Sequence, residues 1–321
     1  MRIYGMIVRQ PAIESGVYKH LGAVLLSGYL ALYGAMLLAL HWAANFDPTE
    51  PLLVFAIVGV GFTAISWLST ARAERLPYPI ADPYRELLTF ATCLPLAIAF
   101  ITWGLGPLHR YIPSATGSAF AVLAAKLIVL VVFPAAIMCK QFGYSWRQLV
   151  PMSARRRDLF AMLVMALLLF GFQALFGRGL KDIADAHIST TKLALGFPLT
   201  FLWLSLEAGV VEEFFFRVLL QTRLTAVLKS ALGGIVLTSL TFGLAHAPGI
   251  YLRTALTQEG LQNPSVLMAL GYSIVVISLT GFFLGVLWAR THNFVLVVVV
   301  HAMGDLLPNL LPTLRSLRLL S

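Results

Sequence analysis

Two adjacent carboxylates and an arginine interrupt a run of sequence, residues 197–220, that is otherwise almost entirely apolar. A charged side chain at the centre of a bilayer costs about 3 kcal/mol even on lenient insertion scales, so such residues are rarely present without a role. Residues four apart share a face of a helix, and we therefore expect Glu213 to pair with Arg217. Glu212 is rotated about 100° away from this pair and stays free to act as a general base.

Two further pairs at helical spacing complete a set that could hydrolyse an amide bond. Phe242 and His246 lie one turn apart, and so do His301 and Asp305. Glu212 and His246 could orient and deprotonate a water molecule, while the other pair could stabilise the oxyanion that develops on a peptide carbonyl. The predicted catalytic residues are Glu212, His246, His301 and Asp305, with Glu213, Arg217 and Phe242 as structural support.

The same side chains leave a metal-dependent alternative open. Glu213, His246 and His301 could hold a zinc ion whose fourth ligand is water, with another glutamate as the base. The chain lacks the compact His-Glu-x-x-His spacing, so separate helices would have to supply the ligands. The expected cofactor is therefore either zinc or none.

The composition indicates what kind of element must position these residues. Of the 321 residues, 59% are hydrophobic and only 12% are charged, and the mean hydropathy is +0.85. A soluble domain needs far more polar surface, so the sequence predicts a polytopic membrane protein in contact with the lipid bilayer. The net charge of +9 falls mostly in loops, where it reflects membrane topology, and we expect no nucleic acid as a partner.

A spanning helix needs about 20 mostly apolar residues, and the chain has nine such runs. They are residues 21–43, 52–69, 87–105, 118–138, 159–177, 197–220, 232–247, 266–289 and 293–311. The sequence thus predicts an all-α transmembrane bundle. With a rise of about 1.5 Å per residue, the predicted catalytic side chains lie about 12 to 22 Å from one membrane face, a depth that is compatible with a shared site.

The loops suggest the orientation and a division of the chain. The loop that carries Lys140, Arg147 and Arg155–Arg157 is the strongest basic signal, and it places the N-terminus in the cytoplasm with the protein in the inner or plasma membrane. The most polar connection, residues 178–196, separates an expected N-terminal region of five helices (residues 1–196) from a C-terminal four-helix core (residues 197–321).

Several other polar side chains lie in or beside the predicted spans, and the sequence allows more than one role for some of them. Glu207, in the sixth run, could line a cavity or pair with Lys126 in the fourth, although Lys126 could also extend to the membrane surface. The remaining histidines fall at span ends or in loops and are expected to be interfacial or solvated: His20, His41, His109, His187 and His292.

In these motifs the chain resembles the intramembrane protease family that includes type II CAAX prenyl endopeptidases and bacteriocin-processing enzymes, called the CPBP or Abi family. The family pattern is Glu-Glu-x-x-x-Arg, then Phe-x-x-x-His, then His-x-x-x-Asn/Asp, on separate transmembrane helices. Here it reads Glu212-Glu213…Arg217, Phe242…His246 and His301…Asp305, and the resemblance covers about 200–311.

The resemblance implies a membrane endopeptidase with its active site in a polar cavity and a protein or peptide substrate, with membrane-anchored proteins included. Glu212 would activate water with help from His246, and His301 and Asp305 would lie near the oxyanion. Family members have been described both as metalloproteases and as metal-free glutamate proteases. Two alternatives remain: a non-catalytic scaffold or immunity protein with the same fold, or a proton or cation transporter, although the chain shows no internal repeat.

Overall fold

The computed structural model describes residues 16–104, 111–112, 114–252, 261 and 263–319. Within these ranges the chain is helical and has no strand. Nine of the described helices are long and apolar enough to cross a membrane: His20–Ala44, Thr49–Ser69, Pro83–Gly104, Ala115–Gln141, Arg156–Phe176, Thr190–Leu228, Ala231–Tyr251, Val266–Thr291 and Phe294–Ser316. The prediction of an all-α bundle with nine spans is confirmed.

Several spans combine α-helical and π-helical stretches, the latter labelled η. The elements are α1 (Gly16–Ala44), α2 (Thr49–Val54), η1 (Phe55–Phe62), α3 (Thr63–Ser69), α4 (Pro83–Ala99), η2 (Phe100–Gly104), α6 (Ala115–Leu127), η3 (Ile128–Val132), α7 (Phe133–Gln141), α8 (Trp146–Leu149), α9 (Arg156–Phe176), α10 (Gly179–Asp185), α11 (Thr190–Leu204), η4 (Ser205–Val210), α12 (Val211–Glu213), η5 (Phe214–Gln221), α13 (Thr222–Leu228), α14 (Ala231–Tyr251), α15 (Val266–Tyr272), η6 (Ser273–Ile277), α16 (Ser278–Thr291) and α17 (Phe294–Ser316).

Short polar side chains fix where several of these helices begin. In each case an oxygen of the residue before the helix accepts a hydrogen bond from a backbone N–H in the first turn, which satisfies one of the free donors there. The capping residues are Asp82 for α4, Ser114 for α6, Ser189 for α11, Ser230 for α14 and Ser265 for α15.

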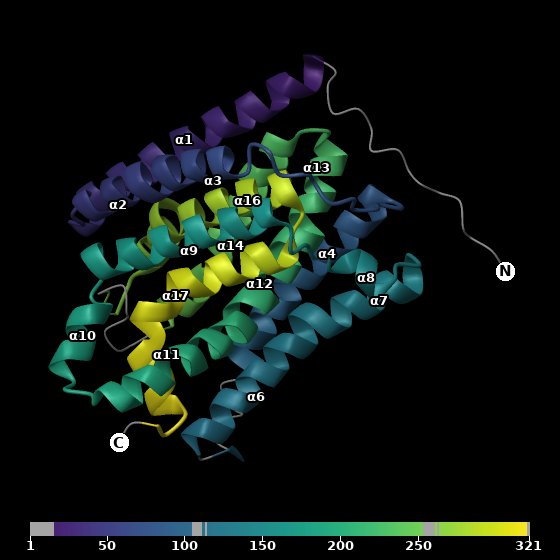
Figure 1. Ribbon diagram of the computed structural model, residues 1–321. Helices are drawn as coiled ribbons and strands as arrows, with labels where there is room; N and C mark the ends of the chain where they lie inside the picture. Colours follow the sequence, from purple (N-terminus) through teal and green to yellow (C-terminus); the bar gives the residue numbers. More distant parts are fainter. Residues whose placement is uncertain (1–15, 105–110, 113, 253–260, 262, 320–321) are drawn as a thin grey trace.

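The last three spans form the centre of the bundle. In the most apolar part of the ninth span 61% of the residues are buried within the protein, against 17% in each of the first three spans. Figure 1 shows α1 and α3 along one side and α6 and α7 along the opposite side, with α14 and α17 between them. Peripheral spans expose most of their apolar side chains, as expected of helices that face lipid.

Two glycines allow the spans that carry the motifs to approach closely. A Cβ on Gly209 in η4 would lie 2.9 Å from the Val298 carbonyl oxygen of α17. A Cβ on Gly243 in α14 would lie 2.3 Å from the Ser273 carbonyl oxygen of η6. Small residues at such contacts bring helix backbones together; Gly209 brings span six close to span nine, and Gly243 brings span seven close to span eight.

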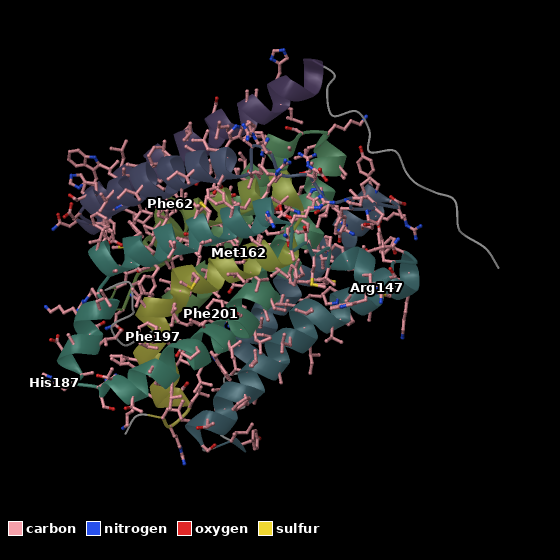
Figure 2. All side chains as sticks on the ribbon, viewed as in Figure 1. Phe62, Arg147, Met162, His187, Phe197 and Phe201 are labelled. Atoms are coloured by element: carbon pink, nitrogen blue, oxygen red, sulfur yellow. The ribbon has the colours of Figure 1, made fainter. Side chains whose placement is uncertain are left out.

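The basic loop and the polar loop lie at opposite ends of α9. Arg147 in α8 and His187 after α10 project at opposite ends of the bundle (Figure 2). A helix that crosses a membrane places the loops at its two ends on different sides of it. Which of the two sides is cytoplasmic stays a prediction.

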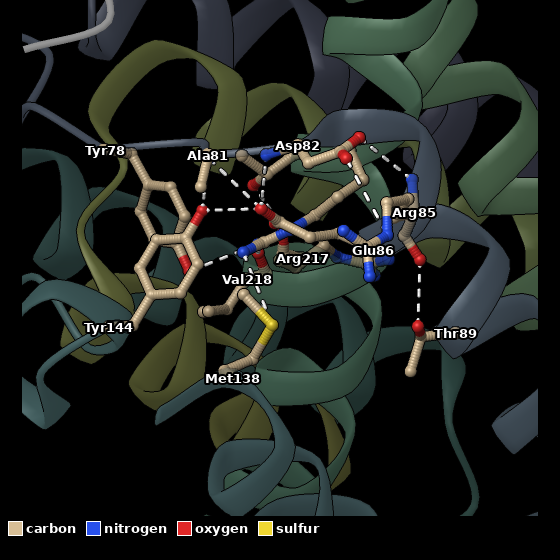
Figure 3. A network of polar contacts seen from close by, with 12 residues as sticks. Tyr78, Ala81, Asp82, Arg85, Glu86, Thr89, Met138, Tyr144, Arg217 and Val218 are labelled. Carbon is tan, nitrogen blue, oxygen red and sulfur yellow. Dashed lines mark hydrogen bonds and ion pairs between the residues drawn. The ribbon is translucent and has the colours of Figure 1, made fainter. Parts of the chain in front are cut away.

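A second buried ion pair, which sequence reasoning did not identify, joins the third span to the sixth. Figure 3 shows Glu86 at its centre. The Arg223 Nε lies 2.8 Å from Glu86 Oε2, and both side chains are fully buried. Tyr144 donates to the other Glu86 oxygen at 2.8 Å, as do the backbone N–H groups of Ala81 and Asp82 at 3.1 and 2.9 Å. Each oxygen of Glu86 and each side-chain nitrogen of Arg223 has a partner, which is what makes a buried pair tolerable.

Span six is longer than predicted: it runs from Thr190 to Leu228 and not only over residues 197–220. Its C-terminal end carries Gln221 and Arg223, which bond to Gly285 and Glu86, and its N-terminal end carries Lys192, so composition alone makes the span look shorter. His292, expected to be interfacial or solvated, is half-buried at the turn between spans eight and nine, where its Nδ1 donates to the Leu76 carbonyl at 2.9 Å and its ring packs on Trp288.

Candidate active site

The structure brings all four predicted catalytic residues together from three spans. Glu212 in α12 places its Oε2 3.7 Å from the Nε2 of His246 in α14 and 3.8 Å from the Nε2 of His301 in α17. The same nitrogen of His301 lies 3.4 Å from Asp305 Oδ2. Glu212 is thus the carboxylate on which both imidazoles converge, and it points away from Arg217 as the helical phase predicted.

Backbone geometry fixes the direction in which His246 presents its lone pair. Its Nδ1 lies 2.8 Å from the carbonyl oxygen of Phe242 one turn earlier. A carbonyl can only accept, so Nδ1 carries the proton and the Nε2 of the neutral ring faces Glu212 with its lone pair free. His246 is therefore arranged to accept a proton or a hydrogen bond on the side of the site.

Glu213 connects Arg217 to His301. One carboxylate oxygen lies 3.0 Å from the Arg217 Nε, and the other lies 2.8 Å from the His301 Nδ1. The side chains of Glu213 and Arg217 are fully buried, and that of His301 is 6% exposed. The predicted Glu213–Arg217 pair is confirmed, and its contact with His301 shows that it also orients an imidazole of the site.

Phe242 is the apolar contact shared by the charged groups. The Arg217 guanidinium lies over its ring, 4.9 Å from the centroid. The same ring lies 4.9 Å from that of His246 and 6.1 Å from that of His301. A cation over an aromatic face is stabilised by the ring quadrupole, so one side chain holds Arg217 and packs against both imidazoles.

The residues do not fit the predicted zinc site. Glu213 contacts the Nδ1 of His301. His246 instead approaches Glu212, which lies on the opposite, Nε2 side of the His301 ring. These three side chains therefore cannot meet at one ion through a single nitrogen of His301. In the part of the chain that the structure describes, no three His, Cys, Asp or Glu side chains are arranged to hold a metal ion.

Other polar predictions have mixed outcomes. Lys126 in α6 does pair with Glu207 in η4, which was one of the two expectations. The side chains of His20, His41 and His187 are exposed as expected. His109 lies outside the described residues. The contact of Glu213 with His301 and the Glu86–Arg223 pair were missed, and neither has a signal in a single sequence because each joins residues far apart in the chain.

Comparison with known proteins agrees with this geometry. Residues 194–307 match the family model described as type II CAAX prenyl endopeptidase Rce1-like. No curated protein and no solved structure matches the chain. The matched segment contains the three motifs that meet around Glu212. The chain is an integral membrane protein whose C-terminal part, over residues 194–307, is similar to the type II CAAX prenyl endopeptidase Rce1-like family.

Proposed function

We propose that this protein is an intramembrane endopeptidase in which Glu212 activates a water molecule for attack on a peptide bond. The observation that carries the proposal is the convergence of His246 and His301 on Glu212 Oε2, a buried oxygen that has no hydrogen-bond partner among the described residues. A buried acceptor without a partner costs about 1 to 3 kcal/mol. A water or substrate group held there would satisfy it.

The chemistry follows from the placement of each group. Glu212 takes a proton from water as the water oxygen bonds to the peptide carbonyl carbon. His246 holds the water through its free Nε2. Carboxylates face both nitrogens of His301, which suits an imidazolium that donates to the oxyanion. Glu212 then returns the proton to the amide nitrogen, the C–N bond breaks, and the carboxylic acid and the amine leave.

The substrate is a protein or peptide segment that reaches the membrane, and the family points to a C-terminal segment next to a prenylated cysteine. We further propose that the N-terminus lies in the cytoplasm and that the protein resides in the inner or plasma membrane. The basic loop at the α7–α9 end of the bundle supports this orientation.

The test uses purified full-length protein and two fluorogenic peptides of one CAAX-type sequence, one farnesylated and one not. We expect Glu212→Gln and His246→Ala to reduce cleavage by at least about 10³-fold, because each removes a group that acts in proton transfer. Melting temperatures in detergent should stay close to that of the wild-type protein, since neither side chain is part of a closed ion pair.

Two results would contradict the proposal. Full activity of either variant would remove Glu212 or His246 from the mechanism. Stable wild-type protein that cleaves neither peptide, nor any membrane protein when cells with and without it are compared by mapping new N-termini, would favour a non-catalytic scaffold.

A further inference from the structure

A side chain from outside the matched segment reaches the candidate active site. Lys126, in the last turn of α6, forms an ion pair with Glu207 of η4. The Lys126 ammonium also interacts electrostatically with Glu212 and Asp305. The fourth span, which the family match does not cover, thus contributes a positive charge beside the predicted base.

This ion pair adjoins a cavity of about 470 Å³ between α6, α11 and the end of α17. Glu207 lines the cavity, together with Val122 and Trp203. Lys126 follows Val122 by four residues and so lies on the same face of its helix. The side chains of Lys126 and Glu207 are 21% and 25% exposed, so the pair is open to this space and is not part of a closed core.

Glu212 has more distant partners than the other carboxylates of the site, because His246 and His301 lie 3.7 and 3.8 Å from its Oε2. Glu213 has Arg217, Asp305 has His301 at 3.4 Å, and Glu207 has Lys126. An uncompensated Glu207 would put a second negative charge near Glu212, and two neighbouring carboxylates compete for one proton. Without Glu207, Lys126 would turn to Glu212 and hold it in an ion pair.

Resting on the proposed function, we propose that Lys126 is a positioning residue of the reaction: it neutralises Glu207, which precedes Glu212 by five residues on the same span, and so keeps a second uncompensated negative charge away from the predicted base. Lys126 acts through Glu207 and does not touch the substrate. The pair joins α6 to η4, and its ammonium also interacts electrostatically with Glu212 on α12 and Asp305 on α17.

A double-mutant cycle tests this inference with the peptide that the wild-type protein cleaves. We expect Lys126→Met to lower kcat by about tenfold or more with little change in KM, because it leaves Glu207 uncompensated. Glu207→Gln should also lower kcat, because Lys126 then pairs with Glu212. The double variant Lys126→Met/Glu207→Gln should recover to within about threefold of the wild type, and Lys126→Arg should stay near the wild type.

The outcomes separate this inference from the proposed function. A double variant no more active than Lys126→Met would show that the lysine itself contacts the substrate, which overturns the positioning role. Full activity of Lys126→Met, with Glu212→Gln inactive, would overturn the inference and leave the proposed function intact. Unchanged cleavage by Glu212→Gln would overturn both. Melting temperatures of the four proteins exclude misfolding, since a purely structural pair would lower them without the recovery in kcat.

Discussion

At the scale of single residues, most N–H groups of the Arg217 guanidinium have no hydrogen-bond acceptor among the described residues. Its Nη1 and Nη2 have no hydrogen-bond partner among the described residues, and its charge rests on Glu213 and on the ring of Phe242. Removing a partner of a buried pair leaves the other charge uncompensated. The pair is therefore a point at which the bundle is sensitive to substitution.

Arg217→Ala should destabilise the protein by about 3 to 5 kcal/mol, because Glu213 then stays buried without a counter-charge. Thermal unfolding in detergent measures this. The matched control is Arg155→Ala, which breaks an exposed pair with Glu74 at 2.7 Å and should cost about 1 kcal/mol or less. Equal melting temperatures of the two variants would show that the Glu213–Arg217 pair is not structural.

The side chains that meet around Glu212 could be predicted, because helical spacing and the depth of each residue in its span can both be derived from a single sequence. The pairing of Glu213 with Arg217 followed from the same rule. The place of Glu213 beside the Nδ1 of His301 could not be foreseen, because it depends on how α17 is rotated against α12. That rotation also decides against the zinc set, which sequence spacing had left open.

At the scale of elements, the site depends on how closely η4 and α17 pack. Gly209 lies against Val298, which precedes His301 by one helical turn. Any atom added at Gly209 pushes α17 away from the span that carries Glu212. If these two spans move apart, the side chains of Glu212 and His301 that they carry move apart as well.

Gly209→Ala should lower cleavage by about tenfold or more, because a Cβ 2.9 Å from the Val298 carbonyl forces α17 to shift and small displacements of catalytic groups are costly. Cleavage of the test peptide at saturation measures this. The control is Gly34→Ala in the middle of α1, where a Cβ has nothing within 4 Å. If both variants cleave like the wild type, the close approach does not position the site.

The existence and order of the spans were predictable, and their ends were not. Apolar runs of the right length give nine helices, but span six carries polar residues at both ends and extends well past residues 197–220. Arg223 illustrates the cause, since its partner Glu86 lies 137 residues away and no local pattern links them. The division at residue 196 and the cytoplasmic N-terminus stay predictions.

At the scale of the whole molecule, the first five spans do more than cover the C-terminal four. Helix α9 packs along α17, α1 packs along α14, and α6 supplies Lys126 to the site. The Glu86–Arg223 network fixes α4 to the end of span six (Figure 3). The segment after α3 is tied to the turn between spans eight and nine, because Leu76 accepts from His292 and donates its own N–H to Thr291.

His292 makes this last connection sensitive to pH. Burial lowers the pKa of its imidazole to about 4, and the positive charge of Arg75 acts in the same direction, while the hydrogen bond to Leu76 opposes them. The ring is therefore neutral in the folded protein at a pH where the unfolded chain, with a pKa near 6.5, binds a proton. Folding stability must then fall as the pH drops from about 6.5 towards 4.

We expect the melting temperature of the wild-type protein to decrease between pH 7 and pH 5 by more than that of His292→Asn. Asparagine tolerates the left-handed backbone found at this position, where φ is 50°, and carries no titrating group. Comparing the two proteins isolates His292, because the carboxylates that also titrate over this range are common to both. Parallel pH profiles would show that the turn between spans eight and nine admits water and a charged imidazole without opening.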